Sequence, residues 1–250
     1  MKSLRSALHL LEMVGRARGG ARVKDLAERS GVNTASVSKM LSTLAAQGFV
    51  RRDESTRRYV LGFKLLELST RLIEGLDVRE VARPILQRLE TETNEVVNLA
   101  AYHNGELIYI DKYEGTRSLR MHSVIGGRAG WEHTAVGKAV YANLPENEKA
   151  YLLETFTYPA KTPASITGKG VYLAQVADAA VCGYAVDLEE NEVGIICVGA
   201  AVLDYSGTAI GAVSISWPVV RGGLQRLTML QEPLTKACKE ISVAMGFKGP

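Results

Sequence analysis

The stretch from residue 23 to residue 61 constrains this chain most, because it combines a helix, a glycine turn, a second helix and a basic hairpin. Residues 23–30 have a helical pattern, residues 31–33 (Gly-Val-Asn) predict a turn, and residues 34–47 predict the second helix. Asn33 stands where a helix N-cap is expected, and its side chain suits that role. The stretch therefore predicts a helix-turn-helix.

The second predicted helix has two chemically different faces. Its buried face is predicted from apolar residues at helical spacing, namely Val37, Met40, Leu41 and Leu44. The other face and the first turn hold short, polar or basic side chains, namely Thr34, Ala35, Ser36, Ser38, Lys39 and Ser42. A helix with such a face can enter the major groove of DNA, where longer side chains would hold it off the base edges. We therefore predict that these six residues contact DNA.

A β-hairpin is predicted directly after this helix. Residues 49–52 and 57–61 resemble two short strands, and the polar residues 53–56 join them. Each strand carries two arginines, which suits contact with phosphates. The predicted backbone contacts are Arg22, Arg51, Arg52, Arg57 and Arg58. The whole arrangement is typical of a winged helix-turn-helix, and the alternative is a small helical domain with a solvated basic face.

Formal charge is unevenly distributed along the chain. The 250 residues hold 30 Lys and Arg against 27 Asp and Glu, a net charge of +3. Residues 1–75 contain 14 basic and 7 acidic residues (+7), whereas residues 76–250 contain 16 basic and 20 acidic residues (−4). A basic N-terminal part followed by a mildly acidic remainder indicates that residues 1–75 bind nucleic acid and that the rest of the chain has a second function. The length leaves room for a larger second domain with its own core.

Patterns typical of enzymes, metal sites and membrane proteins are missing from the sequence. The cysteines are widely spaced and odd in number, which predicts neither a disulfide framework nor a metal site: Cys182, Cys197 and Cys238. The histidines share no ligand spacing, and no Ser/His/Asp set or Gly-rich phosphate loop stands at usable spacing. No signal peptide opens the chain, and no apolar run approaches the roughly 18 residues of a membrane span. We expect a cytoplasmic protein without enzymatic activity, cofactor or metal.

The order of predicted elements suggests three parts. Residues 1–62 form the winged helix-turn-helix with an added helix over residues 4–17, and residues 63–76 form a linker helix. Residues 77–250 are predicted to hold helices over 78–92, 134–143, 146–155, 172–181 and 224–245, and strands over 96–103, 106–113, 118–124, 183–187, 193–204 and 208–217. Asn104-Gly105 predicts a two-residue hairpin turn. Helices that flank an antiparallel sheet are typical of the α+β class.

Five segments in order carry a further signal: GVNTASVSKMLSTLAAQGFV, RYVLGFKLLEL, HTAVGKAVYA, GYAVDLEENEVGIICVGAAVLD and GAVSISWP. They resemble the isocitrate-lyase-regulator (IclR) family of bacterial transcription factors. The resemblance implies a GAF-like C-terminal domain that binds a small carboxylate metabolite, and dimers or tetramers on operator DNA. We expect a regulator of a catabolic operon and favour a repressor, with an activator as the alternative. LIYIDKYEGTRSLRMHSVIG and SISWP with AMGF are most similar to regulators of sugar-acid catabolism, such as the one responding to 2-keto-3-deoxygluconate.

Several residues in the second domain are predicted to contact this metabolite. The amides of Ala135, Val136 and Gly137 start a helix, and a helix N-terminus attracts carboxylate. Ser214 and Ser216 lie two apart on a strand and therefore point to one face. Asp187 ends its strand and can accept hydrogen bonds from ligand hydroxyls. The resemblance adds Met121, His133 and Cys197 to the predicted effector contacts. The alternative for each is a structural role, such as tight packing at Gly137.

Some residues depart from the family pattern. Gly130-Trp131-Glu132 replaces the usual proline or leucine pair before His133, so Trp131 can form an apolar wall and Glu132 can repel an anion if it points inward. The alternative function is a thiol- or metal-responsive transcription factor with the same fold. That alternative predicts a response to oxidation or zinc in place of an organic acid.

Overall fold

The computed structural model describes residues 2–74, 77–116 and 123–249. Backbone contacts divide the chain into two compact units, residues 1–75 and residues 76–250. Among the described helices, none is both long and apolar enough to cross a membrane.

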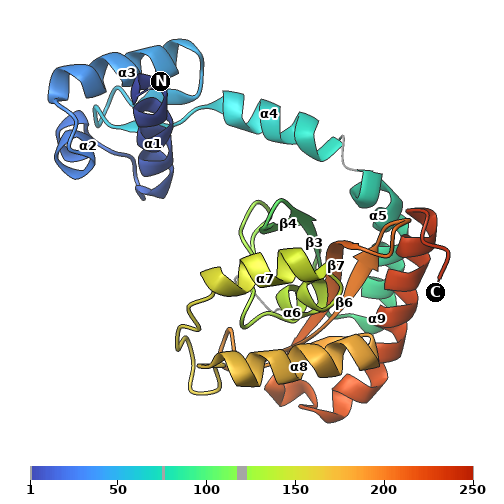
Figure 1. Ribbon diagram of the computed structural model, residues 1–250. Coiled ribbons are helices and arrows are strands. Elements are labelled where there is room, and N and C mark those ends of the chain that lie inside the picture. Colours follow the sequence, from blue (N-terminus) through green and yellow to red (C-terminus); the bar gives the residue numbers. More distant parts are fainter. Residues whose placement is uncertain (1, 75–76, 117–122, 250) are drawn as a thin grey trace. The chain divides into compact units, whose positions relative to one another are not determined.

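The N-terminal unit places three helices around one small core. Its elements are α1 (Lys2–Arg16), α2 (Val23–Ser30), α3 (Thr34–Ala46), β1 (Val50–Arg52), β2 (Tyr59–Leu61) and α4 (Phe63–Glu74) (Figure 1). Leu10 of α1, Leu26 of α2 and Leu41 of α3 are buried together in this core, and of these three the helical spacing predicts Leu41. Gly31 ends α2 in the left-handed conformation (φ 69°), which a glycine adopts without strain.

The hairpin of the N-terminal unit has a third arm that the sequence did not predict. β1 and β2 pair antiparallel, with Val50 opposite Leu61. Ala21 forms an isolated bridge with Tyr59, in which each amide donates to the other residue's carbonyl (2.9 and 2.8 Å). The segment before α2 is thereby joined to the hairpin.

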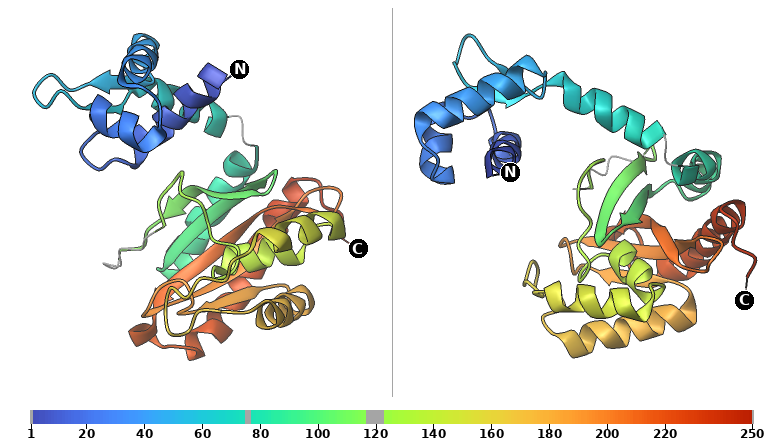
Figure 2. Two further views of the ribbon diagram at one scale, coloured as in Figure 1. Left: turned by 60° about the vertical axis from the view of Figure 1, so that its left-hand side comes forward. Right: turned by 45° about the horizontal axis from the view of Figure 1, so that its top comes forward.

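The C-terminal unit is an antiparallel sheet with helices on both faces. Its elements are α5 (Asp77–Thr93), β3 (Val96–His103), β4 (Glu106–Tyr113), α6 (Ala135–Ala142), α7 (Glu146–Thr155), α8 (Lys169–Cys182), β5 (Ala185–Leu188), β6 (Ile195–Leu203), β7 (Ala209–Pro218), the 3₁₀ turn η1 (Val219–Arg221) and α9 (Gln225–Ala244). The strand order is β4-β3-β7-β6-β5. Helices α5 and α9 cover one face, and α6 and α8 cover the other (Figures 1 and 2). The predicted α+β fold is confirmed.

Strand β7 shows how the sheet separates its two faces. Val213, Ile215 and Trp217 are fully buried in the core shared with α5 and α9. Successive side chains of a strand point to opposite faces, so Ser214 and Ser216 lie on the α6 side. The sequence placed these two serines on one face, and the register agrees.

The predicted hairpin at Asn104-Gly105 is also confirmed. Both residues have positive φ (49° and 83°), as a tight two-residue turn between β3 and β4 requires. The predicted strand over residues 118–124 lies mostly outside the described residues. Residues 123 and 124, which are described, are not in a strand.

Candidate functional site

Helix α3 presents the polar face that the sequence predicts. The side chains that are exposed on it are Thr34, Ala35, Ser38, Lys39 and Ser42, with Ser36 half-buried. Asn33 Oδ1 accepts a hydrogen bond from the Ser36 amide at 2.9 Å, which confirms the predicted N-cap. Val37 and Leu41 on the opposite side are fully buried. The helix is therefore held by one face while the other stays accessible.

The turn of the hairpin is organised by Asp53. Its Oδ1 accepts hydrogen bonds from the Ser55 hydroxyl (2.6 Å), the Ser55 amide (3.0 Å) and the Thr56 amide (2.9 Å). The bond from the Ser55 hydroxyl, followed by those from Thr56, lowers the pKa of Asp53 to about 2. The turn is thus fixed by a carboxylate that stays ionised at neutral pH.

The arginines of the hairpin differ in their surroundings. Arg51, Arg52 and Arg57 are exposed, as expected for phosphate contacts, and so is Arg22. Arg58 is half-buried, and its Nη1 donates a hydrogen bond to the Gly20 carbonyl at 3.1 Å. Arg58 therefore also holds the turn after α1 against the hairpin, a structural role that the sequence did not reveal.

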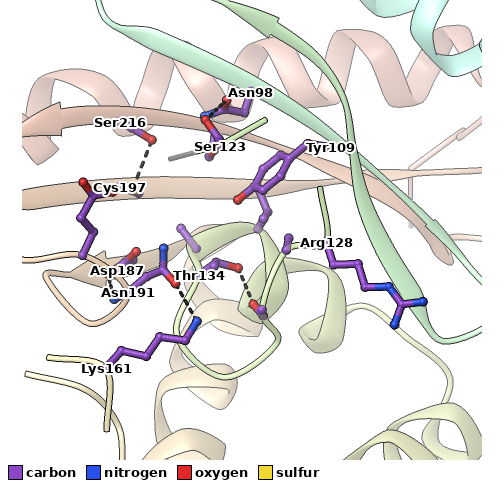
Figure 3. Close-up of a pocket in the computed structure, with 16 residues that line it drawn as sticks. Asn98, Tyr109, Ser123, Arg128, Thr134, Lys161, Asp187, Asn191, Cys197 and Ser216 are labelled. Carbon is purple, nitrogen blue, oxygen red and sulfur yellow. Dashed lines mark hydrogen bonds between the residues drawn. The ribbon is translucent and has the colours of Figure 1, made fainter. Parts of the chain in front are cut away.

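The C-terminal unit contains a cavity of about 120 Å³ on the α6 side of the sheet (Figure 3). Six of the predicted effector contacts line it: Ala135, Val136, Asp187, Cys197, Ser214 and Ser216. The other lining residues are Asn98, Tyr109, Ser123, Arg128, Ala129, Gly130, Thr134, Lys161, Asn191 and Glu192. The lining is mostly polar, which suits a small polar ligand.

The start of helix α6 supplies backbone amides to this cavity. Thr134 is the N-cap, and the Ala135 and Val136 amides have no hydrogen-bond partner among the described residues. Gly199 on β6 permits the close approach of the helix, since a Cβ there would lie 2.7 Å from the Ala135 carbonyl carbon. The helix N-terminus therefore reaches the cavity with free donors and a favourable dipole.

The expectation of a free Gly137 amide is wrong. Thr134 Oγ1 accepts a hydrogen bond from that amide at 3.0 Å, and Gly137 does not line the cavity. A Cβ on Gly137 would lie 2.4 Å from the Gly130 carbonyl oxygen and 2.8 Å from the Trp131 Cα. Gly137 therefore serves tight packing, which was the alternative for this residue.

Hydroxyl and thiol groups form the sheet side of the cavity. The Ser216 hydroxyl donates to Cys197 Sγ at 3.1 Å, and the Ser123 hydroxyl donates to Asn98 Oδ1 at 2.9 Å. Burial raises the pKa of the Cys197 thiol well above its usual value, and the nearby Asp187 adds to the shift. A protonated, buried thiol is a weak nucleophile. Cys197 therefore forms part of the cavity wall as a protonated thiol.

Asp187 is the most deeply buried carboxyl of the cavity lining, with 3% of its surface exposed. Its Oδ1 accepts hydrogen bonds from the Glu190 amide (2.8 Å) and the Asn191 amide (3.3 Å). Burial raises the pKa of Asp187 to about 7, although the Lys138 charge opposes the shift. Burial also raises the pKa of Tyr109, whose side chain faces the same space (Figure 3).

Two basic side chains border the cavity. Lys161 Nζ donates to Asn191 Oδ1 at 2.9 Å, which holds the ammonium near the opening. Arg128 is paired with Glu106, and its side chain is 74% exposed. Lys161 is thus the cation that points toward the cavity, whereas the guanidinium of Arg128 points away from it (Figure 3).

The remaining predicted contacts lie elsewhere. His133 is fully buried and does not line the cavity, so the structure does not bring it together with the other predicted contacts. Burial and then the Lys161 charge lower the pKa of His133, so its ring is neutral near pH 7. Glu132 accepts a hydrogen bond from the Thr157 amide at 3.2 Å, and Trp131 packs against Tyr102 and Phe156. The prediction for Met121 lies outside the described residues.

Sequence reasoning missed several lining residues. Asn98 had a readable signal, because a polar residue interrupts the apolar run of β3, and it is only 2% exposed. No sequence signal indicated Lys161, because it lies in an irregular loop between α7 and α8. Also missed was the fully buried Lys138, whose Nζ lies 2.8 Å from both carboxylate oxygens of Glu190.

A metal- or thiol-based site has little support in the part of the chain that the structure describes. No three His, Cys, Asp or Glu side chains gather there as a metal ion would require. Cys197 and Cys238 are buried, and burial raises the pKa of both thiols. Cys182 is exposed and does not line the cavity.

Comparison with known proteins decides the family. The sequence profile of "Bacterial transcriptional regulator IclR C-terminal" matches residues 70–243, and that of "IclR helix-turn-helix domain" matches residues 3–54. This chain belongs to the IclR family. Its relatives include the HTH-type transcriptional regulator KdgR of Escherichia coli (strain K12), 31% identical over 90% of this chain and 86% of KdgR. The transcriptional repressor IclR of the same organism is 29% identical over 98% and 90% of the two chains.

A solved family member has the same fold. The crystal structure of the Thermotoga maritima IclR superposes with a TM-score of 0.78 and 32% identity, covering 99% of this chain and 100% of that one. The protein is therefore a DNA-binding transcriptional regulator, with an N-terminal helix-turn-helix and a C-terminal mixed α/β domain. The family consists of regulators and not of enzymes.

Proposed function

We propose that this IclR-family protein represses a catabolic operon and is controlled by a small hydroxylated carboxylate bound in the C-terminal cavity. The observation that carries the proposal is the arrangement of donors around that cavity. The Ala135 and Val136 amides and the Lys161 ammonium favour a carboxylate at one side. The Ser214 and Ser216 hydroxyls suit the hydroxyl or keto oxygens of the same ligand. A sugar acid or keto acid has both kinds of group.

The DNA-binding half of the proposal rests on α3 and the hairpin. The exposed face of α3 would enter the major groove, and Arg22, Arg51, Arg52 and Arg57 would contact phosphates. A homodimer or tetramer would place two such units one DNA turn apart. Repression is supported by the relative named a transcriptional repressor. Such a regulator acts in the cytoplasm, where the operon is.

The test is fluorescence anisotropy on DNA from the region upstream of the protein's own gene, at fixed salt, with sugar acids, keto acids and aromatic acids. One acid should change operator affinity severalfold, equivalent to a coupling of about 1–3 kcal/mol. A Ser214→Ala/Ser216→Ala protein should bind the operator normally and lose that response.

A matched variant tests the DNA-binding surface separately. Lys39→Ala should lose operator affinity and keep acid binding. Unchanged operator binding by this variant would refute the assignment of α3. A specific operator complex that ignores every acid but responds to oxidation or zinc would favour the thiol or metal alternative, which Cys197→Ser then tests.

A further inference from the structure

Asp187 is placed where an anionic ligand must come close to it. The carboxyl lies at the end of β5, opposite Cys197 in the register of β6, and both residues line the cavity. Its Oδ1 accepts hydrogen bonds from two backbone amides. The cavity that receives a carboxylate at the α6 end therefore already contains a buried carboxyl group.

The nearest buried cation is matched by another anion. Lys138 Nζ contacts both oxygens of Glu190 at 2.8 Å and Gln175 Oε1 at 2.7 Å, which occupies its three N–H donors. Lys138 and Glu190 thus balance each other, and neither is more than 3% exposed. Asp187 is left as an additional buried charge whenever it is ionised.

The other groups that face Asp187 do not supply a balancing charge within the cavity. On β4 and β6, Tyr109 and Cys197 are neutral, because burial raises the pKa of both. Glu192 of the β5–β6 loop lines the cavity and is acidic. Lys161 is the cation at the opening, where the anionic ligand would also be attracted. Strands β3 and β7 contribute Asn98, Ser214 and Ser216 to the lining, which are uncharged.

We infer that Asp187 is a specificity-determining residue that is neutral when the effector is bound, so that its carboxyl group donates a hydrogen bond to an oxygen of the ligand. Above pH 7, where the free carboxyl is mostly ionised, close to one proton then passes from solvent to Asp187 for each effector bound. The inference deepens the proposed function, because it takes the effector to be a small carboxylate.

Two physical effects support this inference. Burial already raises the pKa of Asp187 to about 7 without a ligand. A second anion in the same cavity disfavours the ionised form further. The ligand class follows: the atom facing Asp187 is an acceptor, such as a carboxylate or keto oxygen. This replaces the expectation that Asp187 accepts from a ligand hydroxyl.

The test begins with the free protein. A carbon-13 NMR titration of the Asp carboxyls, assigned with Asp187→Asn, should show the Asp187 carboxyl titrating with a pKa of about 7. A pKa of about 4, the ordinary value, would overturn the inference whether or not any acid binds.

The second part is isothermal calorimetry with 2-keto-3-deoxygluconate, D-gluconate and pyruvate, at pH 8 in buffers of different ionisation enthalpy. The wild type should take up close to one proton per site, and its affinity should fall about tenfold per pH unit above pH 7. Asp187→Asn, which keeps a donor, should bind without proton uptake, and Asp178→Asn on the exposed face of α8 should behave as wild type.

The outcomes separate this inference from the proposed function. Tight binding by the wild type without proton uptake would overturn the inference and leave the carboxylate effector standing. If none of the acids binds, the proposed effector class fails, and the free-protein titration alone decides whether Asp187 is a neutral carboxyl.

Discussion

The two units of this regulator treat the same side chain in opposite ways. In the hairpin of the N-terminal unit, Asp53 is solvated, and hydrogen bonds from Ser55 and Thr56 lower its pKa to about 2. In the C-terminal unit, Asp187 is buried beside the cavity, and burial raises its pKa to about 7. Residue type alone therefore does not decide the charge of a carboxyl group. Access to water and the partners of the carboxyl do.

This contrast follows from what each unit binds. The basic side chains of a DNA-binding surface displace the counterions condensed on DNA phosphates, so in the free protein they stay exposed and each contributes little to folding. A small-molecule cavity excludes water, so a charge inside it must be paired or neutralised. Arg51 and Arg52 represent the first case, and Lys138 with Glu190 the second.

The largest effect is expected for Lys138→Met. The substitution leaves Glu190 buried without its partner, which should lower the free energy of unfolding by about 3–5 kcal/mol. Chemical denaturation of the C-terminal unit measures it. Lys149→Met, which breaks the pair with Glu146, is the matched control; the Glu146 carboxylate is 89% exposed and stays solvated, so the loss should be about 1 kcal/mol or less. Lys138→Met/Glu190→Leu should recover most of the loss, and a small loss in the single variant would contradict the buried pair.

The second effect is a dependence of stability on pH. Because the folded-state pKa of Asp187 lies above its unfolded value, the native state holds more protons between these values, and stability falls as the pH rises. The loss between pH 4 and pH 7 should be about 3 kcal/mol relative to Asp187→Asn. Denaturation curves of both proteins at several pH values measure it. If the free energies of unfolding of the two proteins change with pH in the same way, the pKa of Asp187 is not raised by folding.

A smaller effect is expected at the cap of α3. Asn33→Ala removes the acceptor for the Ser36 amide and should cost about 1 kcal/mol of stability in the N-terminal unit. Hydrogen exchange of the first turn of α3 measures the local loss. Asn33→Ser keeps a capping oxygen and should retain most of the stability, so equal losses in both variants would mean that the cap contributes nothing.

The smallest effect on stability is expected for Arg51→Ala. The side chain is exposed, so the free energy of unfolding should change by less than about 0.5 kcal/mol. Operator and random DNA should both bind more weakly, and the slope of log affinity against log salt should fall by about 1. Lys24→Ala on α2, whose ammonium faces Glu28, is the control for a non-specific charge change. A selective loss for the operator alone would instead indicate base recognition.

The local elements were predictable because neighbours in sequence determine them. Asn33, Gly31 and the helical spacing defined α2 and α3, and Asn104-Gly105 defined the β3–β4 turn. That Ser214 and Ser216 point to the same face of the sheet followed from strand geometry alone. The cavity lining could not be predicted from neighbours in sequence, because Lys161 and Asn191 are 30 positions apart and meet only in the folded chain.

Sequence patterns predicted the helix-turn-helix, the α+β class and the serine face of β7, because each depends on short-range periodicity and turn chemistry. The folded chain was needed to see that Gly137 packs closely against Gly130 and Trp131, that His133 is enclosed, and that Lys138 is paired with Glu190. Burial accounts for this difference. Water access and long-range partners set the charge and the reach of each side chain, and both come from segments distant in the chain.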